Sequence, residues 1–378
     1  MKRNMLILTN RTLHNGPRMI REFQTFKNDF NITAFGLSKP LDEEIHYEDI
    51  NQFRTLPLQI TNALLRRLFY KKWWGGVAEY YPLIEAYILK NNFDAIIIHD
   101  PTFLPLISRL KSKRPFLSIY NAHEYHPLEF EDKPQWTETI GRYLTTLYKN
   151  HLPDIDLMIN VCEGIAQECE NKFQKKSLVI PNVANESAIA PTENTGIIKL
   201  IYHGAIMQSR NIEDMIDVMK ILGNGYSLDI MGMVSSGNES YFATLKQYAL
   251  QAGNVYFRDA VPFNEIVPTI NQYDIGLFLL RPNNFNYTHA LPNKLFEFIQ
   301  AKLAIAVGPS VEMKRVVNQY HLGVVSDDFS AESLASAIKQ LDRAAIKQFK
   351  QHAVAASAIE NAAHYANIYL QQVKAFMN

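Results

Sequence analysis

Residues 199–213, which read KLIYHGAIMQSRNIE, decide the fold of the second half of the chain. A short apolar run at 199–203 ends at Gly204, and after a brief loop a helix is expected to open near Ser209 to Asn211. Apolar residues then recur at helical spacing, so one stripe of that helix would face a core: Ile212, Met215, Ile216 and Met219. This order of strand, glycine loop and helix predicts one unit of a parallel α/β sheet.

The same alternation of short strand and longer helix runs through both halves of the chain. The expected strands are 5–9, 32–36, 95–99, 116–120, 157–161 and 178–180, then 199–203, 227–231, 254–257, 274–280, 303–307 and 323–325. Further helices are expected at 18–26, 80–90, 137–151, 164–173, 241–252 and, with no strand after it, 354–377. Such alternation predicts parallel sheets with helices on both faces.

The length of 378 residues exceeds one ordinary hydrophobic core, so two domains are expected. The stretch 185–197 lacks hydrophobic periodicity and is interpreted as a linker. It would separate a first domain, 1–184, from a second domain, 198–353. The C-terminal helix, 354–378, could pack on the second domain or cross back to the first.

Charge and cysteine content exclude some classes of function. Lys plus Arg and Asp plus Glu number 38 each, and a net charge of zero argues against a nucleic-acid partner. Only Cys162 and Cys169 occur, which is typical of a reduced, intracellular protein. The apolar stretch Met5–Leu8 is too short for a signal peptide, and no run approaches the roughly 20 residues that span a bilayer. A cytoplasmic protein is expected.

The segment 64–74, LLRRLFYKKWW, concentrates four cations and four aromatic residues. This mixture suits a helix that lies on an anionic membrane surface. It suits equally a helix that packs on its own domain with its cations solvated. If the membrane contact is real, the protein would lie at the inner face of the membrane and would fit a lipid-linked acceptor.

Two segments of the second half carry residues suited to a nucleotide. Arg210 lies at the expected helix opening, where a guanidinium can fork onto a diphosphate beside free backbone N–H groups. After Pro292, which suits the first turn of a helix, Lys294 suits a phosphate and Glu297 suits two vicinal hydroxyls such as those of ribose. The alternatives are an ordinary turn with a surface arginine and a surface ion pair of Lys294 with Glu297.

Two loops of the first half follow expected strands, where doubly wound folds place their ligands. The loop at 119–127, IYNAHEYHP, holds His123, Glu124 and His126; contact with sugar hydroxyls or acid–base chemistry is favoured over metal binding, because no further ligand is evident. A structural histidine is the alternative for His126. In the loop at 9–18, Gly16 precedes a helix whose N-terminus would carry Arg18, unless this is a plain turn with a solvated arginine.

Three further features of the sequence bear on which ligands the protein could bind. There is no Gly-x-Gly-x-x-Gly fingerprint for nicotinamide or flavin nucleotides. The Asp154–Asp156 pair has the Asp-x-Asp spacing of metal-dependent sugar transferases but precedes a strand, so a solvated loop is expected and no metal site is assigned. Gly232 is interpreted as a tight turn after its strand, although such turns also let a ligand approach closely.

Taken together, these segments resemble GT-B-fold retaining glycosyltransferases, specifically glycosyltransferase family four. The similarity covers nearly the whole chain, and its most specific match is PNKLFE at 292–297. The matched segments follow the family order: 15–22 (family pattern D-P-R-v-x-x-E), 120–124 (y-D-a-H-E, with Asn121 for Asp), 180–182 (i-P-N), 204–210 (G-x-x-x-x-x-K/R-g) and 292–297 (P-n-K-l-f-E-y).

The resemblance implies an α/β protein with two Rossmann-like β/α/β domains that face a central cleft. It implies transfer of a sugar from a nucleotide-diphosphate sugar (UDP- or GDP-sugar) to a glycan or lipid-linked acceptor. The transfer would proceed with retention and without a metal or other cofactor, in polysaccharide or glycoconjugate synthesis. Two alternatives stay open: a sugar-nucleotide epimerase or hydrolase of the same fold, and a non-catalytic nucleotide-binding partner subunit.

The resemblance also implies roles by position. Arg210 and Lys294 would hold the donor diphosphate, Glu297 the ribose, and His123 would lie beside the donor sugar at the reacting centre. The remaining donor-side residues would be Gly204, Phe257, Arg258, Val261, Pro262, Asn293 and Leu295, and the remaining substrate-side residues Gly16, Arg18, Glu124 and His289. The chain departs from the family at His289, where a glutamate is usual, and at Ala205, where an arginine is usual.

Overall fold

The computed structural model describes residues 2–14, 16–53 and 81–377, and the chain divides into two compact units. Unit 1 comprises Met1–Pro181, Asn284–Asn286 and Ala366–Asn378, and unit 2 comprises Asn182–Asn283 and Tyr287–Tyr365. The cationic and aromatic segment 64–74 lies outside the described residues. Each unit is built on a parallel sheet with helical connections, which confirms the expected α/β class with two Rossmann-like domains.

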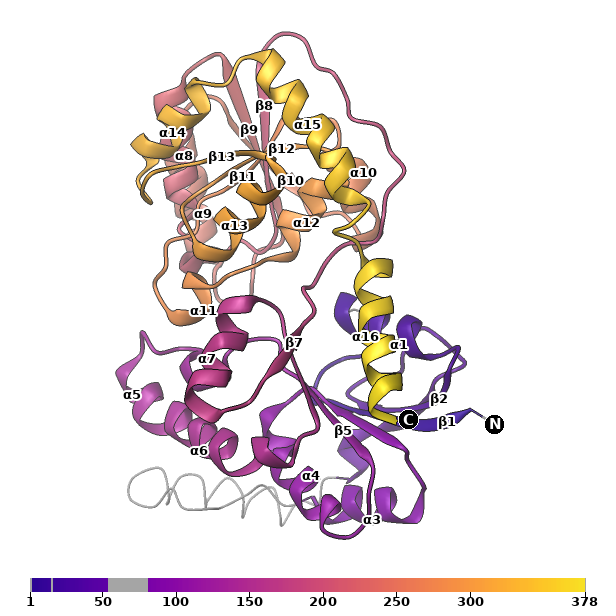
Figure 1. Cartoon of the computed structure of the whole chain (residues 1–378). Coiled ribbons are helices and arrows are strands. Elements are labelled where there is room, and N and C mark those ends of the chain that lie inside the picture. The colour runs from indigo at the N-terminus through magenta and orange to yellow at the C-terminus, as the bar shows by residue number, and fades with distance from the viewer. Residues whose placement is uncertain (1, 15, 54–80, 378) are drawn as a thin grey trace. The chain divides into compact units, whose positions relative to one another are not determined.

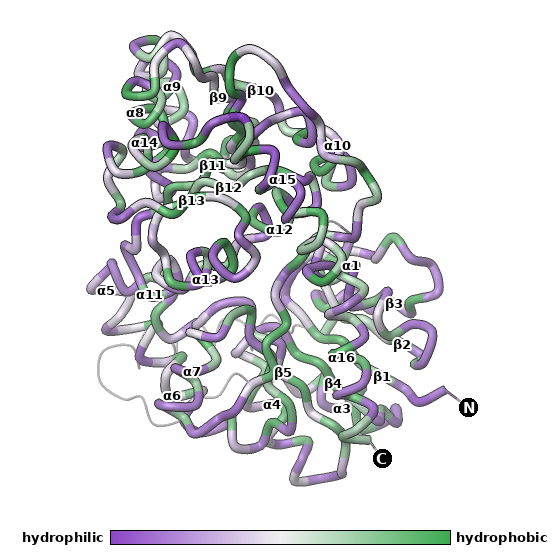
Figure 2. Tube along the Cα trace, turned by 45° about the horizontal axis from the view of Figure 1, so that its top comes forward, coloured by the Kyte–Doolittle hydropathy of each residue, from purple (hydrophilic) through white to green (hydrophobic). Residues whose placement is uncertain are grey.

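Unit 1 has a seven-stranded sheet in the order β3-β2-β1-β4-β5-β6-β7, and every neighbouring pair is parallel. Buried aliphatic residues fill β4 and most of β1 because both faces of a parallel sheet are covered, and β4 runs green in Figure 2. The strands are β1 (Arg3–Leu8), β2 (Phe30–Gly36), β3 (His46–Asp49), β4 (Ala95–Ile98), β5 (Leu117–Asn121), β6 (Leu157–Asn160) and β7 (Ser177–Val179).

Two helices from opposite ends of the chain cover one face of this sheet. Helix α1 buries Met19, Phe23 and Phe26 in the same core cluster as Tyr369 of α16, and the rings of Phe26 and Tyr369 meet edge-on at 4.8 Å. The C-terminal helix therefore packs on the first unit, which is one of the two placements expected from the sequence. The helices described in unit 1 are α1 (Pro17–Phe26), α3 (Pro82–Lys90), α4 (Leu104–Lys111), α5 (Pro134–Trp136), α6 (Arg142–His151), α7 (Glu163–Phe173) and most of α16 (Ala362–Met377).

Unit 2 has a six-stranded parallel sheet in the order β10-β9-β8-β11-β12-β13. Its strands are β8 (Ile198–His203), β9 (Tyr226–Gly232), β10 (Val255–Asp259), β11 (Ile275–Phe278), β12 (Ala304–Val307) and β13 (Gly323–Val325). Its helices are α8 (Ile212–Leu222), α9 (Glu239–Ala249), α10 (Ile266–Ile270), the second half of α11 (Phe285–Thr288), α12 (Asn293–Gln300), α13 (Val311–Tyr320), α14 (Ala331–Lys339) and α15 (Arg343–Ser357). The expected linker has neither helix nor strand and is counted with this unit.

The expectation of one C-terminal helix over 354–378 is wrong. Helix α15 ends at Ser357 and α16 begins at Ala362. The side chain of Asn361 separates them, because its Nδ2 donates to the carbonyls of Ser357 (3.2 Å) and Ala358 (2.8 Å) while its Oδ1 accepts from the backbone N–H of His364 (2.9 Å). One asparagine thus satisfies the end of one helix and caps the start of the next.

Candidate functional site

Gly204 directly follows strand β8, and both its backbone conformation and a neighbouring side chain favour a glycine at this position. Gly204 has φ +129°, a region that favours glycine. A Cβ built there would also lie 3.3 Å from Nζ of Lys294. The sequence places Gly204 at this point, and the structure shows that the missing side chain leaves room beside a buried cation.

Lys294 is that cation, at the second position of helix α12. Pro292 has an extended backbone (φ −78°, ψ 152°) and precedes the helix, so the expectation that it forms part of the first turn is wrong. The Lys294 ammonium lies 3.7 Å from the ring centre of Phe278 and 4.2 Å from that of Tyr202, and the residue is buried. Burial, together with the nearby charge of Arg210, holds its pKa well below the ordinary value. A buried ammonium between two rings is a site that gains from an arriving anion.

Arg210 lies in a single 3-10 turn, Gln208–Arg210, ahead of helix α8. The helix begins at Ile212 with Asn211 as its N-cap, which agrees with the expected opening near Ser209 to Asn211; Asn211 has a left-handed backbone (φ 47°). The guanidinium is half-buried and lies 5.0 Å from the ring centre of Tyr287. Arg210 is therefore presented beside Lys294, by a turn rather than by the first helical residues.

Glu297 lies one turn after Lys294 and is buried, so the alternative of a surface ion pair is excluded. Its Oε2 lies 3.3 Å from Nε2 of His203, the last residue of β8. Burial, and then the charge of Lys294, lower the pKa of His203 to about 3, so this imidazole is neutral around pH 7. The Glu297 carboxylate thus faces a neutral ring, and it is an acceptor of the kind that sugar hydroxyls bind.

Gly232 holds the Gly204 loop by close backbone contact. A Cβ at Gly232 would lie 2.0 Å from the carbonyl oxygen of Gly204, and the Gly204 N–H donates to Met231 at 3.0 Å. The sequence reading of a tight turn fits this packing between two backbones.

Replacing Gly232 by alanine is therefore expected to displace the Gly204 loop and to destabilise unit 2, by roughly 1–3 kcal/mol. Thermal unfolding should show a lowered Tm for Gly232→Ala. The matched control is Gly225→Ala, because a Cβ at Gly225 meets nothing within 4 Å. Equal Tm values for the two variants would contradict the close-packing role of Gly232.

The residues expected to border the base contact other parts of unit 2. Phe257 packs edge-on against Phe242 at 5.3 Å. Arg258 donates through Nε to Asp229 at 2.9 Å, where Tyr273 also donates at 2.5 Å. In the loop after β10, Val261 is half-buried and Pro262 is exposed. Of the other expected site residues in unit 2, Leu295 is buried and His289 is half-buried after α11. Asn293 accepts a hydrogen bond from Asn182 at 2.6 Å. The guanidinium of Arg258 is thus held by a carboxylate.

In unit 1, His123 belongs to a chain of three polar side chains. Its Nε2 lies 2.8 Å from Nδ1 of His99, whose Nε2 lies 2.7 Å from Oε2 of Glu22. His99 and Glu22 are buried and His123 is half-buried in the loop after β5. The sequence analysis did not identify His99 as a site residue. It directly follows strand β4, so it lies at the carboxyl edge of the sheet, as the loop that carries His123 does.

Arg18 lies at the second position of α1 and is half-buried against this chain of side chains. Its guanidinium donates to Oδ1 of Asn121, whose Nδ2 donates to Oε1 of Glu22 at 2.8 Å. Burial outweighs the nearby charge of Glu22 and lowers the pKa of Arg18 to about 10. The alternative of a solvated arginine is excluded, and Gly16 directly precedes α1.

The loop residues after His123 have distinct roles. His126 is buried, with Nδ1 3.1 Å from the hydroxyls of both Tyr120 and Tyr148. Burial lowers the pKa of His126 to about 4, so it is a neutral, hydrogen-bonded core histidine. This agrees with the alternative that His126 has a structural role. Glu124 is exposed.

The Asp154–Asp156 pair, to which no metal site was assigned, lies outside the candidate site. Asp156 is exposed before β6; it accepts from the backbone N–H of Ser118 at 2.8 Å and pairs with Lys111. Across the described residues, no three His, Cys, Asp or Glu side chains are grouped to hold a metal ion. Within the same residues, each helix is too short or too polar to cross a bilayer.

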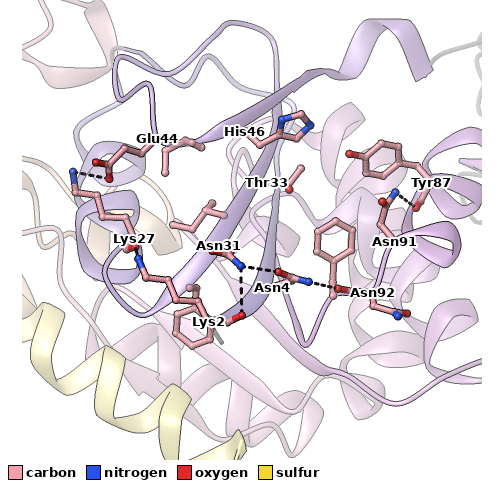
Figure 3. Close-up of a pocket in the computed structure, with 14 residues that line it drawn as sticks. Lys2, Asn4, Lys27, Asn31, Thr33, Glu44, His46, Tyr87, Asn91 and Asn92 are labelled. Atoms are coloured by element: carbon pink, nitrogen blue, oxygen red, sulfur yellow. Dashed lines mark hydrogen bonds and ion pairs between the residues drawn. The ribbon is translucent and has the colours of Figure 1, made fainter.

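A pocket of about 610 Å³ lies at the amino ends of β1, β2 and β3 in unit 1 (Figure 3). Two of its amide side chains already have partners: Asn31 donates to Oδ1 of Asn4 at 3.1 Å, and Asn4 donates to the backbone carbonyl of Asn92 at 2.9 Å. Parallel α/β sheets bind their ligands at the opposite, carboxyl edge, where His99 and His123 lie. We therefore assign this pocket no part in the site.

Comparison with known proteins supports the fold. No protein-family model and no curated protein matches the chain. Solved structures match over nearly their whole length, at low identity. Sucrose-phosphate synthase from Thermosynechococcus elongatus has a TM-score of 0.74 at 13% identity and 99% coverage of both chains.

Two further structures were determined with nucleotides. A mutant of TarM from S. aureus, in complex with fondaparinux, α-GlcNAc-glycerol and UDP, has a TM-score of 0.68 at 11% identity, covering 98% of this chain and 99% of that one. An E. coli trehalose-6-phosphate protein bound with UDP-2-fluoro glucose has a TM-score of 0.67 at 12% identity, with the same coverages. The chain thus has the fold of GT-B glycosyltransferases, two Rossmann-like domains with parallel sheets.

Proposed function

We propose that this chain is a glycosyltransferase that takes a sugar from a nucleotide-diphosphate donor and passes it to a hydroxyl of a glycan or lipid-linked acceptor. The observation that carries the proposal is the buried ammonium of Lys294, held between the rings of Phe278 and Tyr202 and repelled by Arg210. Two cations brought together beside a glycine turn form a receptor for a diphosphate, which would remove their mutual repulsion.

Unit 2 would bind the donor. Arg210 and Lys294 would hold the diphosphate, with Gly204, Asn293 and Leu295 around it. Glu297 would accept from the ribose hydroxyls, and the strand end at 257–262 would border the base. A uridine or guanosine donor is proposed, and the UDP in the TarM complex and the UDP-sugar in the E. coli complex favour uridine as the first base to test.

Unit 1 would supply the acceptor side. His123 would contact the reacting sugar, while Gly16, Arg18 and Glu124 would border the acceptor. His289 of unit 2 would take the place next to the donor sugar. Of these residues, His123 and Arg18 are held by the buried carboxylate of Glu22, through His99 and Asn121.

The reaction breaks the bond between the anomeric carbon and the diphosphate oxygen and forms a bond from that carbon to the acceptor oxygen. Negative charge grows on the leaving phosphate, where Lys294 and Arg210 would stabilise it. We propose retention through a front-face, ion-pair-like displacement without a metal, in which the acceptor proton passes to the departing phosphate oxygen.

Calorimetric titration of the full chain with UDP, GDP, UDP-glucose and GDP-mannose tests the proposal. Saturable binding selective for one base is expected, followed by release of that diphosphate in the presence of a hydroxyl acceptor from a panel of sugars, sugar phosphates and lipid-linked oligosaccharides. Release without any acceptor would favour a hydrolase or epimerase, and binding without release a non-catalytic subunit. No binding of any nucleotide would overturn the proposal.

The ribose role of Glu297 has its own test. Glu297→Gln replaces one acceptor oxygen by an NH₂ donor, so it is expected to weaken binding of the preferred nucleoside diphosphate by about 1.5–3 kcal/mol, or about 10–150-fold. The 2′-deoxy analogue lacks one of the two hydroxyls, so the variant should weaken its binding less. Calorimetry with both nucleotides measures this difference, and an equal loss for both would argue against the ribose contact.

A further inference from the structure

Three buried or half-buried side chains of unit 1 form one continuous hydrogen-bonded series. Glu22 comes from α1, His99 from the end of β4 and His123 from the loop after β5. The separations are 2.7 Å from Glu22 Oε2 to His99 Nε2 and 2.8 Å from His99 Nδ1 to His123 Nε2. Both distances are those of direct hydrogen bonds, so each imidazole fixes where the proton of the other lies.

Glu22 is anchored as an ionised acceptor. Its Oε1 accepts from Nδ2 of Asn121 at 2.8 Å and from the hydroxyl of Tyr369 at 3.1 Å, which leaves Oε2 for His99. Burial alone would raise the pKa of Glu22, but His99, Asn121 and Arg18 outweigh burial and lower it. A carboxylate with these donors is acceptor-only, so His99 must present Nε2–H to it.

The position of the remaining proton follows from charge. The guanidinium of Arg18 already lies next to the Glu22 carboxylate, bonded to the same Asn121 side chain. We therefore take the buried His99 as a neutral imidazole, because a second cation there would add a desolvation cost. A neutral His99 with its proton on Nε2 has an unprotonated Nδ1, which can only accept. His123 must then donate from Nε2, and its own Nδ1 carries the lone pair.

We infer that Glu22 and His99 are positioning residues that hold His123 in the Nε2–H tautomer, so that its Nδ1 accepts a hydrogen bond from a substrate hydroxyl. The inference rests on the proposed function for the identity of that substrate, a sugar or its acceptor. It assigns the ligand chemistry of His123: Nδ1 accepts a hydrogen bond from a hydroxyl group and does not donate to an anion. The orientation of a histidine by a second group that fixes its tautomer is a general device of such sites.

The tautomer is measurable without any ligand. In the full chain labelled with ¹⁵N-histidine, long-range ¹H–¹⁵N spectra distinguish Nε2–H from Nδ1–H forms, and His123→Asn assigns the signals. We expect His123 in the Nε2–H form. An Nδ1–H form, which a charged His99 donating from both nitrogens would impose, would overturn the inference.

Glu22→Gln tests the series from its far end. A glutamine can donate to Nε2 of His99, which moves the His99 proton to Nδ1 and drives His123 toward the Nδ1–H form. The control Glu44→Gln changes an exposed carboxylate of the same unit outside the series and should leave the His123 signals unmoved. Tyr369→Phe removes one donor to Oε1 and keeps the Oε2 contact, so it too should preserve the tautomer. A Glu22→Gln spectrum that matches the wild type would contradict the inference.

Activity separates this inference from the proposed function. With the sugar nucleotide that binds, Glu22→Gln is expected to lower kcat at least about tenfold while the nucleotide Kd stays unchanged. A loss seen only as raised Kd would point to a merely structural role. If the wild type binds none of UDP-glucose, GDP-mannose, UDP and GDP, the proposed function fails, yet the spectra still decide the tautomer.

Discussion

Replacing Lys294 by methionine is expected to weaken binding of the nucleoside diphosphate by about a hundredfold while raising the Tm of the free protein. The two effects share one cause. In the free protein the ammonium is buried between aromatic rings and repelled by Arg210, so it is held at a cost. In the complex the same charge would meet the diphosphate, and its loss should cost about 3 kcal/mol. Methionine retains the apolar stem without the charge.

The stability gain has a pH dependence of known sign. The folded-state pKa of Lys294 lies well below the ordinary value of 10.5, so between those two values the unfolded chain binds more protons than the folded chain. The contribution of Lys294 to stability therefore rises as pH rises through that interval. The Tm advantage of Lys294→Met should therefore shrink as pH rises toward 10, which thermal unfolding across pH 6–10 measures.

Lys302 supplies the matched control, because it is a buried lysine of the same unit with hydrogen-bond acceptors around it. Its Nζ donates to Oγ of Ser357 at 2.7 Å and to the carbonyl of Ser187 at 3.1 Å. Lys302→Met leaves those acceptors unpaired, so it should lower Tm and leave nucleotide affinity unchanged. A Lys294→Met protein that loses stability, or that binds nucleotide as the wild type does, would contradict the diphosphate role.

The alternation of strands and helices was predictable because buried parallel strands are short aliphatic runs, which stand out in a sequence. The strand β3, with the sequence HYED, was missed because it is a polar edge strand with no apolar alternation. The break before α16 was missed because it depends on one asparagine side chain, Asn361, and not on a proline or glycine.

The candidate site was predictable only in part. The order of motifs pointed to Lys294, Glu297 and His123, but their surroundings depend on contacts between distant residues. Lys294 lies against rings from β8 and β11, and Glu22 meets His99 across 77 positions of the chain. His99 reads in the sequence as the end of an apolar run, so nothing local distinguishes it from a core residue. Burial excludes the alternative of a surface ion pair between Lys294 and Glu297, and the sequence alone does not reveal that burial.

Replacing His123 by alanine is expected to lower kcat by about 10²–10³-fold and to leave the nucleotide Kd within about twofold of the wild type. The nucleotide Kd should stay nearly unchanged because the proposed diphosphate and ribose contacts all come from unit 2, whereas His123 belongs to unit 1. Because burial, with the charge of Arg18 next, holds the pKa of His123 well below 6.5, the wild-type rate should show no loss from its protonation as pH falls through 6.5.

His126 provides the contrast for this experiment. It lies three residues later in the same loop, but its Nδ1 faces the hydroxyls of Tyr120 and Tyr148 in the core. His126→Ala should therefore lower Tm, since it removes a buried side chain and leaves two buried hydroxyls without this partner, while the folded fraction keeps its kcat. Calorimetric Kd, kcat and Tm for both variants separate the two roles. If His123→Ala lost nucleotide affinity and stability together with rate, His123 would be a structural residue like His126, and the reacting group would have to be sought elsewhere at the carboxyl edge of the unit 1 sheet.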